Sequence, residues 1–410
     1  MRIGIFSDTY IPQINGVSTS IEMLRKGLEK KGHKVYIITV NPDNMKYIKE
    51  DRVLRIPGVP IGIFDYRLTS IYPARAIKTI KNWNLDIIHS QTEFGIGTFA
   101  RILAKQYNIP LVHTYHTMYE DYVHYITKGY FNKTGKKIVE HLTLFYCDTT
   151  ATELIVPTKK TYDLFKEKYK VKRNVHIVPT GIEVEKYSKK YSEETINELK
   201  KKIGIKSDDV NLLFVGRLGL EKSVDFLINN HKDIVKKHPN CNLIIIGDGP
   251  ERENLEKLVE KNNLEKNVFF TGKVPLKDIG MYYHLGNVFV TASKTETQGL
   301  TVLEAIAASL PVVAVKDESF IEPIQNDYNG YLFEDSKDYV QYINDLLNDK
   351  NKLDKMSLNA YESSHNYSST TFASNILKVY KLAIKNKKSK KNIFQRVIKK
   401  FKGEKNVSSR

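Results

Sequence analysis

Two glutamates eight residues apart flank an expected helix start in the C-terminal half of the chain. Glu296 lies in the polar segment 294–299, which follows the apolar run 288–292, and Glu304 lies inside the apolar segment 300–308. A strand, a short loop and a helix start leave N–H groups unpaired, and the helix dipole favours an anion there. If every intervening residue were helical, the two carboxylates would be roughly 12 Å apart. That spacing suits hydroxyl groups at the two ends of a nucleotide-sugar's diphosphate, and an ordinary turn with solvated glutamates is the alternative.

Two cations occupy another expected loop. Arg217 and Lys222 follow the apolar run 210–216. A guanidinium binds phosphate oxygens with two parallel hydrogen bonds, and an ammonium is a compact point charge. Together they can neutralise a diphosphate leaving group as its charge develops. Two solvated loop cations are the alternative.

Gly16 and His116 follow expected strands in the N-terminal half. Gly16 lies after the strand 2–6, where a glycine lets a diphosphate approach the backbone. His116 ends the strand-like segment 109–115, and the carboxyl ends of parallel strands face the ligand cleft. A glycine required only by the turn and a structural histidine are the alternatives.

The order of apolar and periodic segments predicts an α/β protein with two doubly wound, Rossmann-like domains facing across a cleft. We expect an N-terminal domain over 1–185, a C-terminal domain over 186–368, a closing helix over 369–385 and a basic tail over 386–410. Residues 187–207 are expected to form a charged, linker-like helix.

Composition limits the class of protein. The 410 residues suffice for two domains, and two cysteines argue against a disulfide framework. The N-terminus is expected to be a strand and not a signal peptide, and no apolar run approaches the ~20 residues of a spanning helix. We find no His/Cys cluster, Asp-x-Asp or phosphate-loop lysine motif, so no metal is expected.

The net charge of +17 is concentrated at the C-terminus, where residues 381–410 carry a net +11. On a helical projection of 391–402, apolar residues including Phe394 and Phe401 share one arc. Cations including Arg396, Lys399 and Lys400 fill the other arc, which suits an anionic membrane surface. A disordered, solvated tail is the alternative, as is a nucleic-acid-binding segment, although no recognition motif accompanies the charge.

A set of short motifs in a fixed order resembles the retaining glycosyltransferases of the GT-B fold, in the branch with an E-x7-E motif. Within that branch the segments 6–17 and 113–122 are similar to bacterial diacylglycerol glucosyltransferases. The resemblance covers nearly all of residues 1–385 and rests on the Gly16 loop, His113-Thr-Tyr-His116-Thr, Val178-Pro-Thr-Gly-Ile, Gly216-Arg-Leu…Glu221-Lys222, Gly247-Asp-Gly-Pro250, Gly272-Lys-Val and Glu296…Glu304.

The resemblance implies a role for each matched position. Many relatives carry an aromatic residue where this chain has Thr297-Gln298, which leaves the donor sugar open. It implies that Arg217 and Lys222 bind the diphosphate, together with the backbone at Gly16 and at Thr297, Gln298, Gly299 and Leu300. It implies that Glu296 binds hydroxyls of the donor sugar and that Glu304 binds the ribose. Lys273 and Val274 are implied to lie near the uracil, and His116 beside the reacting sugar.

Two N-terminal segments mix apolar residues with cations, and the resemblance places both on the acceptor and membrane side. The first contains Phe64 and Arg67, and the second contains Lys133, Lys136 and Lys137. Core-facing aromatic clusters with solvated lysines are the alternative for each.

The resemblance implies transfer of glucose from UDP-glucose to the 3-hydroxyl of 1,2-diacylglycerol with retention, giving alpha-monoglucosyldiacylglycerol. The expected enzyme is peripheral, acts at the cytoplasmic face of a bacterial cell membrane, binds anionic lipids and no nucleic acid, and needs neither a prosthetic group nor an obligatory metal. Another sugar donor, a glycan or other lipid acceptor, an epimerase and a nucleic-acid-binding protein are the alternatives. The addition of a second sugar, the oligomeric state and the protein partners stay open.

Overall fold

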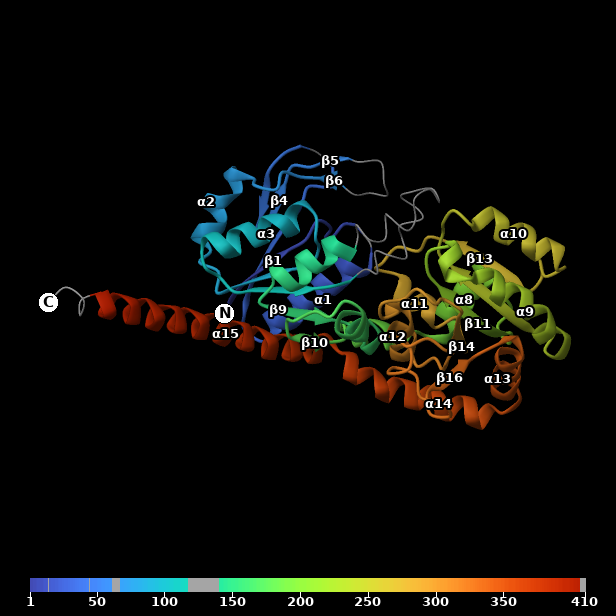
Figure 1. The fold of residues 1–410 in the computed structure, drawn as a ribbon. Coiled ribbons are helices and arrows are strands. Elements are labelled where there is room, and N and C mark those ends of the chain that lie inside the picture. Colours follow the sequence, from blue (N-terminus) through green and yellow to red (C-terminus); the bar gives the residue numbers. More distant parts are fainter. Residues whose placement is uncertain (14, 44, 61–66, 117–139, 406–410) are drawn as a thin grey trace. The chain divides into compact units, whose positions relative to one another are not determined.

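The computed structural model describes residues 1–410 except 14, 44, 61–66, 117–139 and 406–410, and its described side chains end at Lys388 (Figure 1). The chain forms two compact units. The first comprises 1–179 and 372–410, and the second comprises 180–371. The unit boundaries therefore fall at Thr180 and Phe372, a few residues from the domain limits expected from the sequence.

The first unit is built on an eight-stranded sheet in the order β10-β9-β8-β7-β1-β2-β4-β3. Every neighbouring pair is parallel except β3 with β4, which is antiparallel. The strands are β1 (Arg2–Phe6), β2 (Lys34–Val40), β3 (Ile48–Glu50), β4 (Val53–Ile56), β7 (Ile87–Ser90), β8 (Leu111–Thr114), β9 (Glu153–Val156) and β10 (Val175–Ile177). A small antiparallel hairpin of β5 (Val59–Pro60) and β6 (Arg67–Leu68) is separate from this sheet.

Helices α1 (Gly16–Lys30), α2 (Ala74–Asn82), α3 (Gly95–Gln106) and α6 (Lys159–Asp163) also belong to the first unit. The long helix α15 (Ser369–Lys405) joins it from Phe372 onward. Phe372, Ile376 and Tyr380 are buried in the same core as Ile3 and Ile5 of β1. These side chains recur every four residues and so lie on one face of the helix, which explains why α15 packs on this unit.

The second unit is built on a six-stranded parallel sheet in the order β13-β12-β11-β14-β15-β16. Its strands are β11 (Val210–Val215), β12 (Cys241–Ile246), β13 (Val268–Gly272), β14 (Val288–Thr291), β15 (Val312–Val315) and β16 (Gly330–Phe333). This is the doubly wound order 3-2-1-4-5-6, which reverses between the first and fourth strands. Ligands bind such sheets at the carboxyl ends of the strands beside that reversal.

The helices of the second unit are α7 (Val184–Tyr187), α8 (Glu193–Ile203), α9 (Val224–Lys237), α10 (Arg252–Lys261), α11 (Ile279–Tyr283), α12 (Leu300–Ala307), α13 (Ser336–Asn348) and α14 (Lys350–Ser364). The expected single helix over 187–207 is wrong. Helix α8 begins after Ser192, whose hydroxyl accepts a hydrogen bond from Thr195 N–H, and ends at Gly204 in the left-handed region. Tyr187 instead ends α7 and is buried in the core.

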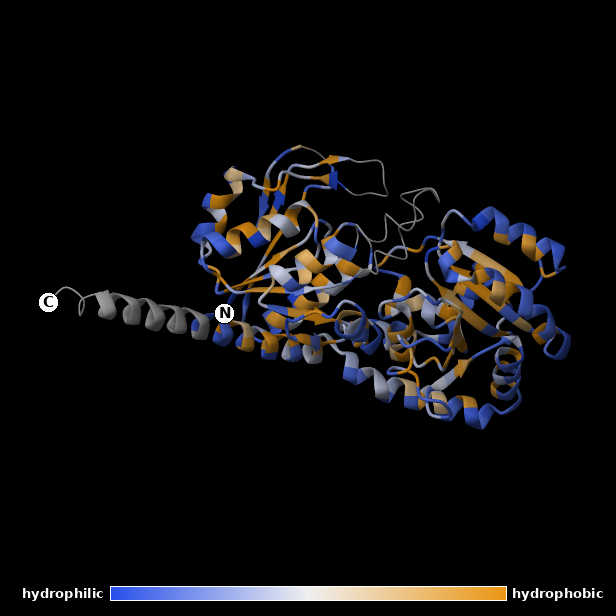
Figure 2. Ribbon diagram, in the orientation of Figure 1, coloured by the Kyte–Doolittle hydropathy of each residue, from blue (hydrophilic) through white to orange (hydrophobic). Residues whose placement is uncertain are grey.

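Hydropathy follows this architecture. The strands of both sheets are predominantly hydrophobic, and polar residues predominate on helices such as α9 and α10 (Figure 2). Strands covered on both faces need continuous apolar runs, which is the pattern that the sequence shows in these segments. Both expected doubly wound sheets are confirmed.

Candidate active site

The loop between β14 and α12 holds the segment that contains Glu296, as expected. Gly299 ends this loop with a φ of 73°, in the left-handed region that favours glycine. A Cβ atom at Gly299 would lie 2.4 Å from Cε1 of Phe320, so the site also lacks space for a side chain. Helix α12 begins at Leu300, and its first N–H groups are available to an anion.

The two glutamates of the sequence motif lie in different environments. Glu296 is in the loop, and only the part from Leu300 to Glu304 is helical, so the 12 Å estimate for an all-helical segment does not apply. Glu296 is partly buried, whereas Glu304 is buried inside α12.

The loop after β11 brings two cations to the same edge of the sheet. Lys222 forms an ion pair with Glu296. The guanidinium of Arg217 donates a hydrogen bond of 2.5 Å to Glu221 Oε1, and the Glu221 side chain is 7% exposed. Because β11 and β14 are the strands at which the order of the sheet reverses, these loops occupy the expected ligand position of the second unit.

Serines hold the Glu296 segment in place. The Ser293 hydroxyl donates to Glu296 Oε1 at 3.0 Å, and the Ser319 hydroxyl donates to the backbone oxygen of Glu296 at 2.6 Å. Glu296 therefore has both a cation and a hydroxyl on one carboxylate oxygen. Ser293, Ser319 and Glu221 were not singled out from the sequence, although Glu221 lies inside a motif that was.

Glu304 interacts with two tyrosines that sequence reasoning missed. The Tyr283 hydroxyl donates to Glu304 Oε2 at 2.7 Å, and Tyr187 lies next to this carboxylate and interacts with it electrostatically. Burial raises the pKa of Glu304, while the two hydroxyls and Lys186 oppose that shift. A local sequence pattern does not predict these contacts, because the two tyrosines belong to α7 and α11 and Glu304 belongs to α12.

Gln298 is engaged with the backbone at the unit boundary. Its side-chain oxygen accepts from Thr180 N–H at 2.8 Å, and its side-chain nitrogen donates to Thr180 O at 3.0 Å. Gln298 is buried, and its neighbour Thr297 is partly buried. The side chain of Gln298 therefore links the loop to Thr180, and only the backbone of Gln298 is a candidate for donor binding.

Lys273 and Val274 follow β13, on the far side of β12 from β11. Lys273 is exposed, and Val274 is partly buried and packs on the core of the second unit. Gly272, with a φ of 72°, makes the turn that leads into them.

In the first unit, Gly16 is the first residue of α1 and is exposed. Asn15 caps this helix through a side-chain oxygen that accepts from Ser18 N–H at 2.9 Å. Because α1 follows β1, its start lies at the reversal point of the first sheet, between β1 and β7.

His116 lies two residues beyond β8 and is half-buried. Its Nε2 atom is 2.6 Å from Oε1 of Gln91, so Nε2 carries the proton and donates it to the amide oxygen. Burial lowers the pKa of His116 to about 4, with Glu93 opposing the shift and His113 adding to it. The imidazole is therefore neutral at pH 7.

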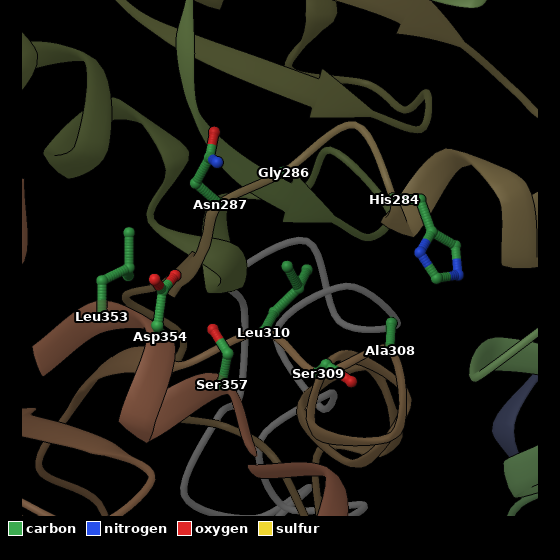
Figure 3. Close-up of a pocket in the computed structure, with 9 residues that line it drawn as sticks. All are labelled: His284, Gly286, Asn287, Ala308, Ser309, Leu310, Leu353, Asp354 and Ser357. Atoms are coloured by element: carbon green, nitrogen blue, oxygen red, sulfur yellow. The ribbon is translucent and has the colours of Figure 1, made fainter. Parts of the chain in front are cut away.

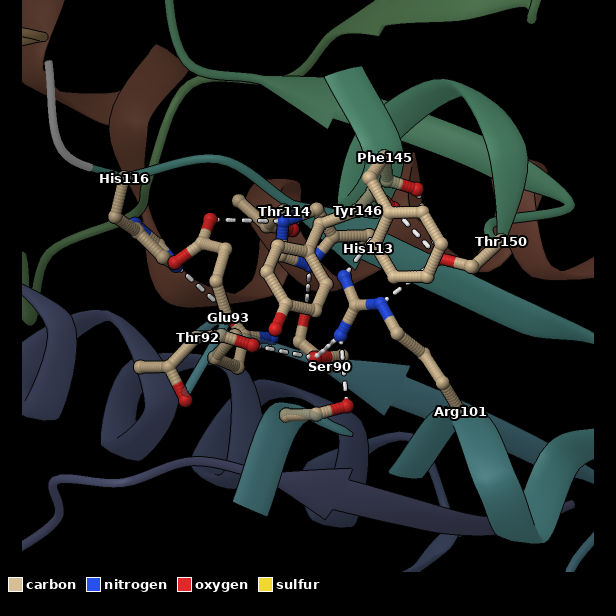
Figure 4. A network of polar contacts seen from close by, with 12 residues as sticks. Ser90, Thr92, Glu93, Arg101, His113, Thr114, His116, Phe145, Tyr146 and Thr150 are labelled. Atoms are coloured by element: carbon tan, nitrogen blue, oxygen red, sulfur yellow. Dashed lines mark hydrogen bonds and ion pairs between the residues drawn. The ribbon is translucent and has the colours of Figure 1, made fainter. Parts of the chain in front are cut away.

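A polar network lies beneath His116, in the part of the first unit drawn in Figure 4. His113 Nε2 is 3.0 Å from Glu93 Oε1. The buried guanidinium of Arg101 donates to Ser90 Oγ at 2.9 Å and lies 4.7 Å from the ring centre of Tyr146. Gln91 and Glu93 follow the carboxyl end of β7, so the rule that pointed to His116 could also have identified them.

Asp8 is a further missed residue at the carboxyl end of β1. One of its carboxylate oxygens accepts from Ile96 N–H at 2.9 Å and the other accepts from the Thr92 hydroxyl at 2.5 Å. Burial raises the pKa of Asp8, with these hydrogen bonds opposing the shift. It thus pairs with an N–H in the first turn of α3 and fixes the loop that carries Gln91 and Glu93.

The structure describes only some of the residues that are expected to contact the membrane. Arg67 is in β6, where its guanidinium donates to Gly58 O at 2.8 Å and to Pro42 O at 3.1 Å. Phe64, Lys133, Lys136 and Lys137 lie outside the described residues, and Phe394, Arg396, Lys399, Lys400 and Phe401 lie on the helical backbone of α15 beyond the last described side chain.

Two further observations on the described residues concern a hollow outside this site and the possibility of a metal site. A shallow hollow lined by His284, Asn287, Ser309 and Asp354 lies at the amino ends of β14 and β15, opposite the edge that carries Glu296 (Figure 3). Within the described ranges, no group of three or more His, Cys, Asp or Glu residues is arranged to hold a metal ion.

Comparison with known families agrees with this architecture. Residues 14–186 match the family described as Glycosyltransferase Family 4, and residues 195–363 match the family described as Glycosyl transferases group 1.

Two curated relatives share a name. The chain is 36% identical over 390 residues to the alpha-monoglucosyldiacylglycerol synthase of Acholeplasma laidlawii, covering 93% of this chain and 96% of that protein. It is also 36% identical over 350 residues to the synthase of the same name from Streptococcus pneumoniae, covering 85% of this chain and 78% of that protein.

Solved structures share the fold at lower identity. A sucrose-phosphate synthase from Thermosynechococcus elongatus superposes with a TM-score of 0.73 at 19% identity, covering 93% of this chain and 98% of that one. Anabaena HepE, solved in complex with UDP and glucose, superposes with a TM-score of 0.70 at 18% identity, covering 92% of this chain and 99% of that one. The chain is therefore an enzyme of the GT-B glycosyltransferase family that includes the alpha-monoglucosyldiacylglycerol synthases.

Proposed function

We propose that this enzyme transfers glucose from UDP-glucose to the 3-hydroxyl of 1,2-diacylglycerol at a membrane surface, with retention of the alpha configuration. The acceptor is supported by the names of the Acholeplasma laidlawii and Streptococcus pneumoniae relatives, which describe synthesis of monoglucosyldiacylglycerol. The donor is supported by Anabaena HepE, a protein of the same fold that was solved with UDP-glucose.

The observation that carries the donor assignment is the meeting of Lys222 and Glu296 at the strand-order reversal of the second sheet. A nucleotide sugar offers a dianionic diphosphate and neutral hydroxyls, which are complementary to a cation and a carboxylate. In this proposal Lys222 and Arg217 bind the diphosphate with the first N–H groups of α12, and Glu296 accepts hydrogen bonds from the sugar. The ion pair places both groups side by side.

These groups favour departure of UDP. The bond between the sugar C1 and the β-phosphate oxygen breaks with its electron pair on UDP, and the cations stabilise the charge that develops there. The acceptor oxygen forms the new bond to C1 on the same face, and its proton passes to the leaving phosphate oxygen. His116 of the first unit is a neutral hydrogen-bonding group whose ring is oriented by Gln91.

A surface of the first unit is suited to lipid. Val59, Leu68, Ile71 and Tyr72 are between 43% and 57% exposed. Arg67 lies among them in sequence, and α2 follows with the exposed cations Arg75, Lys78 and Lys81. Exposed apolar side chains next to cations match a bilayer interface that contains anionic lipids.

This surface and the basic helix α15 are the proposed contacts with the cytoplasmic face of the cell membrane. In the portion of the chain that the structure describes, no helix is long and apolar enough to span a bilayer. Peripheral attachment through the two basic regions accounts for access to a diacylglycerol acceptor.

The direct test is to incubate the purified full chain with UDP-glucose and vesicles of diacylglycerol and anionic phospholipid. We expect an alpha-linked glucosyl-diacylglycerol, identified by mass and by the anomeric proton coupling. Lys222→Ala and Glu296→Ala should each lower kcat by about 100-fold or more, because each removes a group that acts on the reacting donor. Lys236→Ala removes an exposed lysine of α9 that pairs with Asp233 and serves as the matched control.

Each other outcome has a definite meaning. Hydrolysis of UDP-glucose without a glycolipid would retain the donor and direct the search to a glycan or another lipid acceptor. Turnover with a different nucleotide sugar would replace the donor and keep the reaction class. Unchanged kcat in both variants would refute the assignment of this site.

A further inference from the structure

The carboxylate of Glu304 is held by two tyrosines from separate helices. Tyr283, the last residue of α11, donates its hydroxyl hydrogen to Glu304 Oε2 at 2.7 Å. Tyr187, the last residue of α7, lies next to the same carboxylate and interacts with it electrostatically. Glu304 has 9% of its surface exposed, and Tyr187 and Tyr283 are 3% and 0% exposed.

A carboxylate in such a place is costly unless its oxygens are satisfied. Burial favours the neutral acid, and the hydrogen bond from Tyr283 together with the nearby Tyr187 hydroxyl favours the ionised form. An ionised carboxyl group offers about four lone-pair positions, so two phenols leave other positions for further donors. The arrangement is therefore suited to a ligand that brings hydroxyl groups.

The tyrosines are themselves fixed. Their rings meet edge to face, with centres 5.4 Å apart and planes at 90°. The side chain of His284 is 2.7 Å from the backbone oxygen of Tyr187 and donates from Nε2. A Cβ atom at Gly280 would lie 2.6 Å from the backbone oxygen of Lys186, so α7 and α11 approach closely. Neither phenol can rotate freely, and the carboxylate that they hold is fixed in turn.

We propose that Tyr283 and Tyr187 are positioning residues that orient the Glu304 carboxylate toward the ribose hydroxyls of the nucleotide-sugar donor. This inference rests on the proposed function, in which Glu304 binds the ribose. The tyrosines act through Glu304 and touch no reacting atom. Their contribution is thus expected in donor affinity and not in the rate of the chemical step.

The test compares two donors in the full chain. Binding of UDP-glucose, and of an analogue whose ribose lacks both hydroxyls, is measured by calorimetry for the wild type, Tyr283→Phe and Tyr187→Phe. For UDP-glucose we expect the Kd to rise about tenfold in Tyr283→Phe, the size of one lost hydrogen bond to a charged group, and by a smaller factor in Tyr187→Phe, which removes only an electrostatic contact. For the analogue we expect the change to stay within about twofold, because the group that Glu304 binds is missing.

Tyr282→Phe is the matched control, since it makes the same change at the preceding position of α11, where the ring packs on the core. Thermal unfolding of all four proteins separates loss of fold from loss of affinity. Equal weakening of both donors, or no weakening of either, with UDP-glucose bound by the wild type, overturns the positioning role and leaves the proposed function standing. A wild-type chain that binds no UDP-glucose overturns the donor assignment and this role with it.

Discussion

The pH dependence of stability should reveal the buried His231 of α9. This side chain is completely buried in the second unit, and burial lowers its pKa to about 4, with backbone groups at Cys241 and Asn267 opposing the shift. In the unfolded chain a histidine has a pKa of about 6.5. Above pH 6.5 both states hold a neutral ring, and His231 adds no pH dependence to the free energy of unfolding.

The magnitude follows from the two pKa values. As the pH falls from 6.5 towards 4, the unfolded state takes up a proton that the folded state refuses, so stability is lost. Each pH unit in that window is worth about 1.4 kcal/mol, which gives a total of about 3 kcal/mol and about 2 kcal/mol between pH 7 and pH 5.

The assay is urea unfolding of the wild type and of His231→Leu, followed by circular dichroism at pH 5, 6, 7 and 8. Comparing the two proteins isolates His231 from other buried histidines, because those contribute equally to both. We expect the free energy of unfolding of His231→Leu to fall less between pH 7 and pH 5, by about 2 kcal/mol. His365→Leu replaces an exposed histidine and is the control for the substitution itself. Parallel pH curves for wild type and His231→Leu would refute the reasoning.

Three further outcomes are expected. Gly299→Ala should raise KM for the donor and destabilise the second unit by about 2 kcal/mol, because the new methyl group requires a left-handed backbone and meets Phe320; activity and urea midpoints check this. Gln298→Ala should cost about 2 kcal/mol in a urea titration, since it leaves the buried N–H and C=O groups of Thr180 without these partners. Removal of residues 386–410 should reduce sedimentation with anionic vesicles while binding of UDP-glucose is retained, and equal sedimentation would contradict a membrane role for the tail.

Local sequence patterns were sufficient for most of the parallel strands and for the loops that carry the candidate residues. The apolar runs at 210–216 and 288–292 form β11 and β14, and the helix expected after Gly299 is α12. Once two strands of a doubly wound sheet are recognised, their carboxyl ends must lie at one edge. Lys222 and Glu296 could therefore be assigned to one site although they are 74 residues apart.

Other elements were not identified because their patterns are short or polar. Strand β3 has only three residues and none of them is buried, β4 has only four residues, and polar residues predominate in α13 and α14. The helix expected from Tyr187 begins instead at Glu193, because the Ser192 side chain caps the helix there.

The sequence by itself determined the fold class, the order of the two Rossmann-like units and the positions of the loops that carry the candidate residues, since those depend on local hydrophobic pattern and on glycine chemistry. Only the tertiary structure decided which side chains complete the site. The hydrogen bonds of Gln298 with Thr180 join residues that are 118 positions apart in the sequence. The hydrogen bond of Tyr283 with Glu304 joins two helices, and the sequence pattern of neither helix predicts this contact. The physical reason is that a buried polar group needs a hydrogen-bond partner. The fold determines which residue lies close enough to be that partner, and the neighbouring sequence does not.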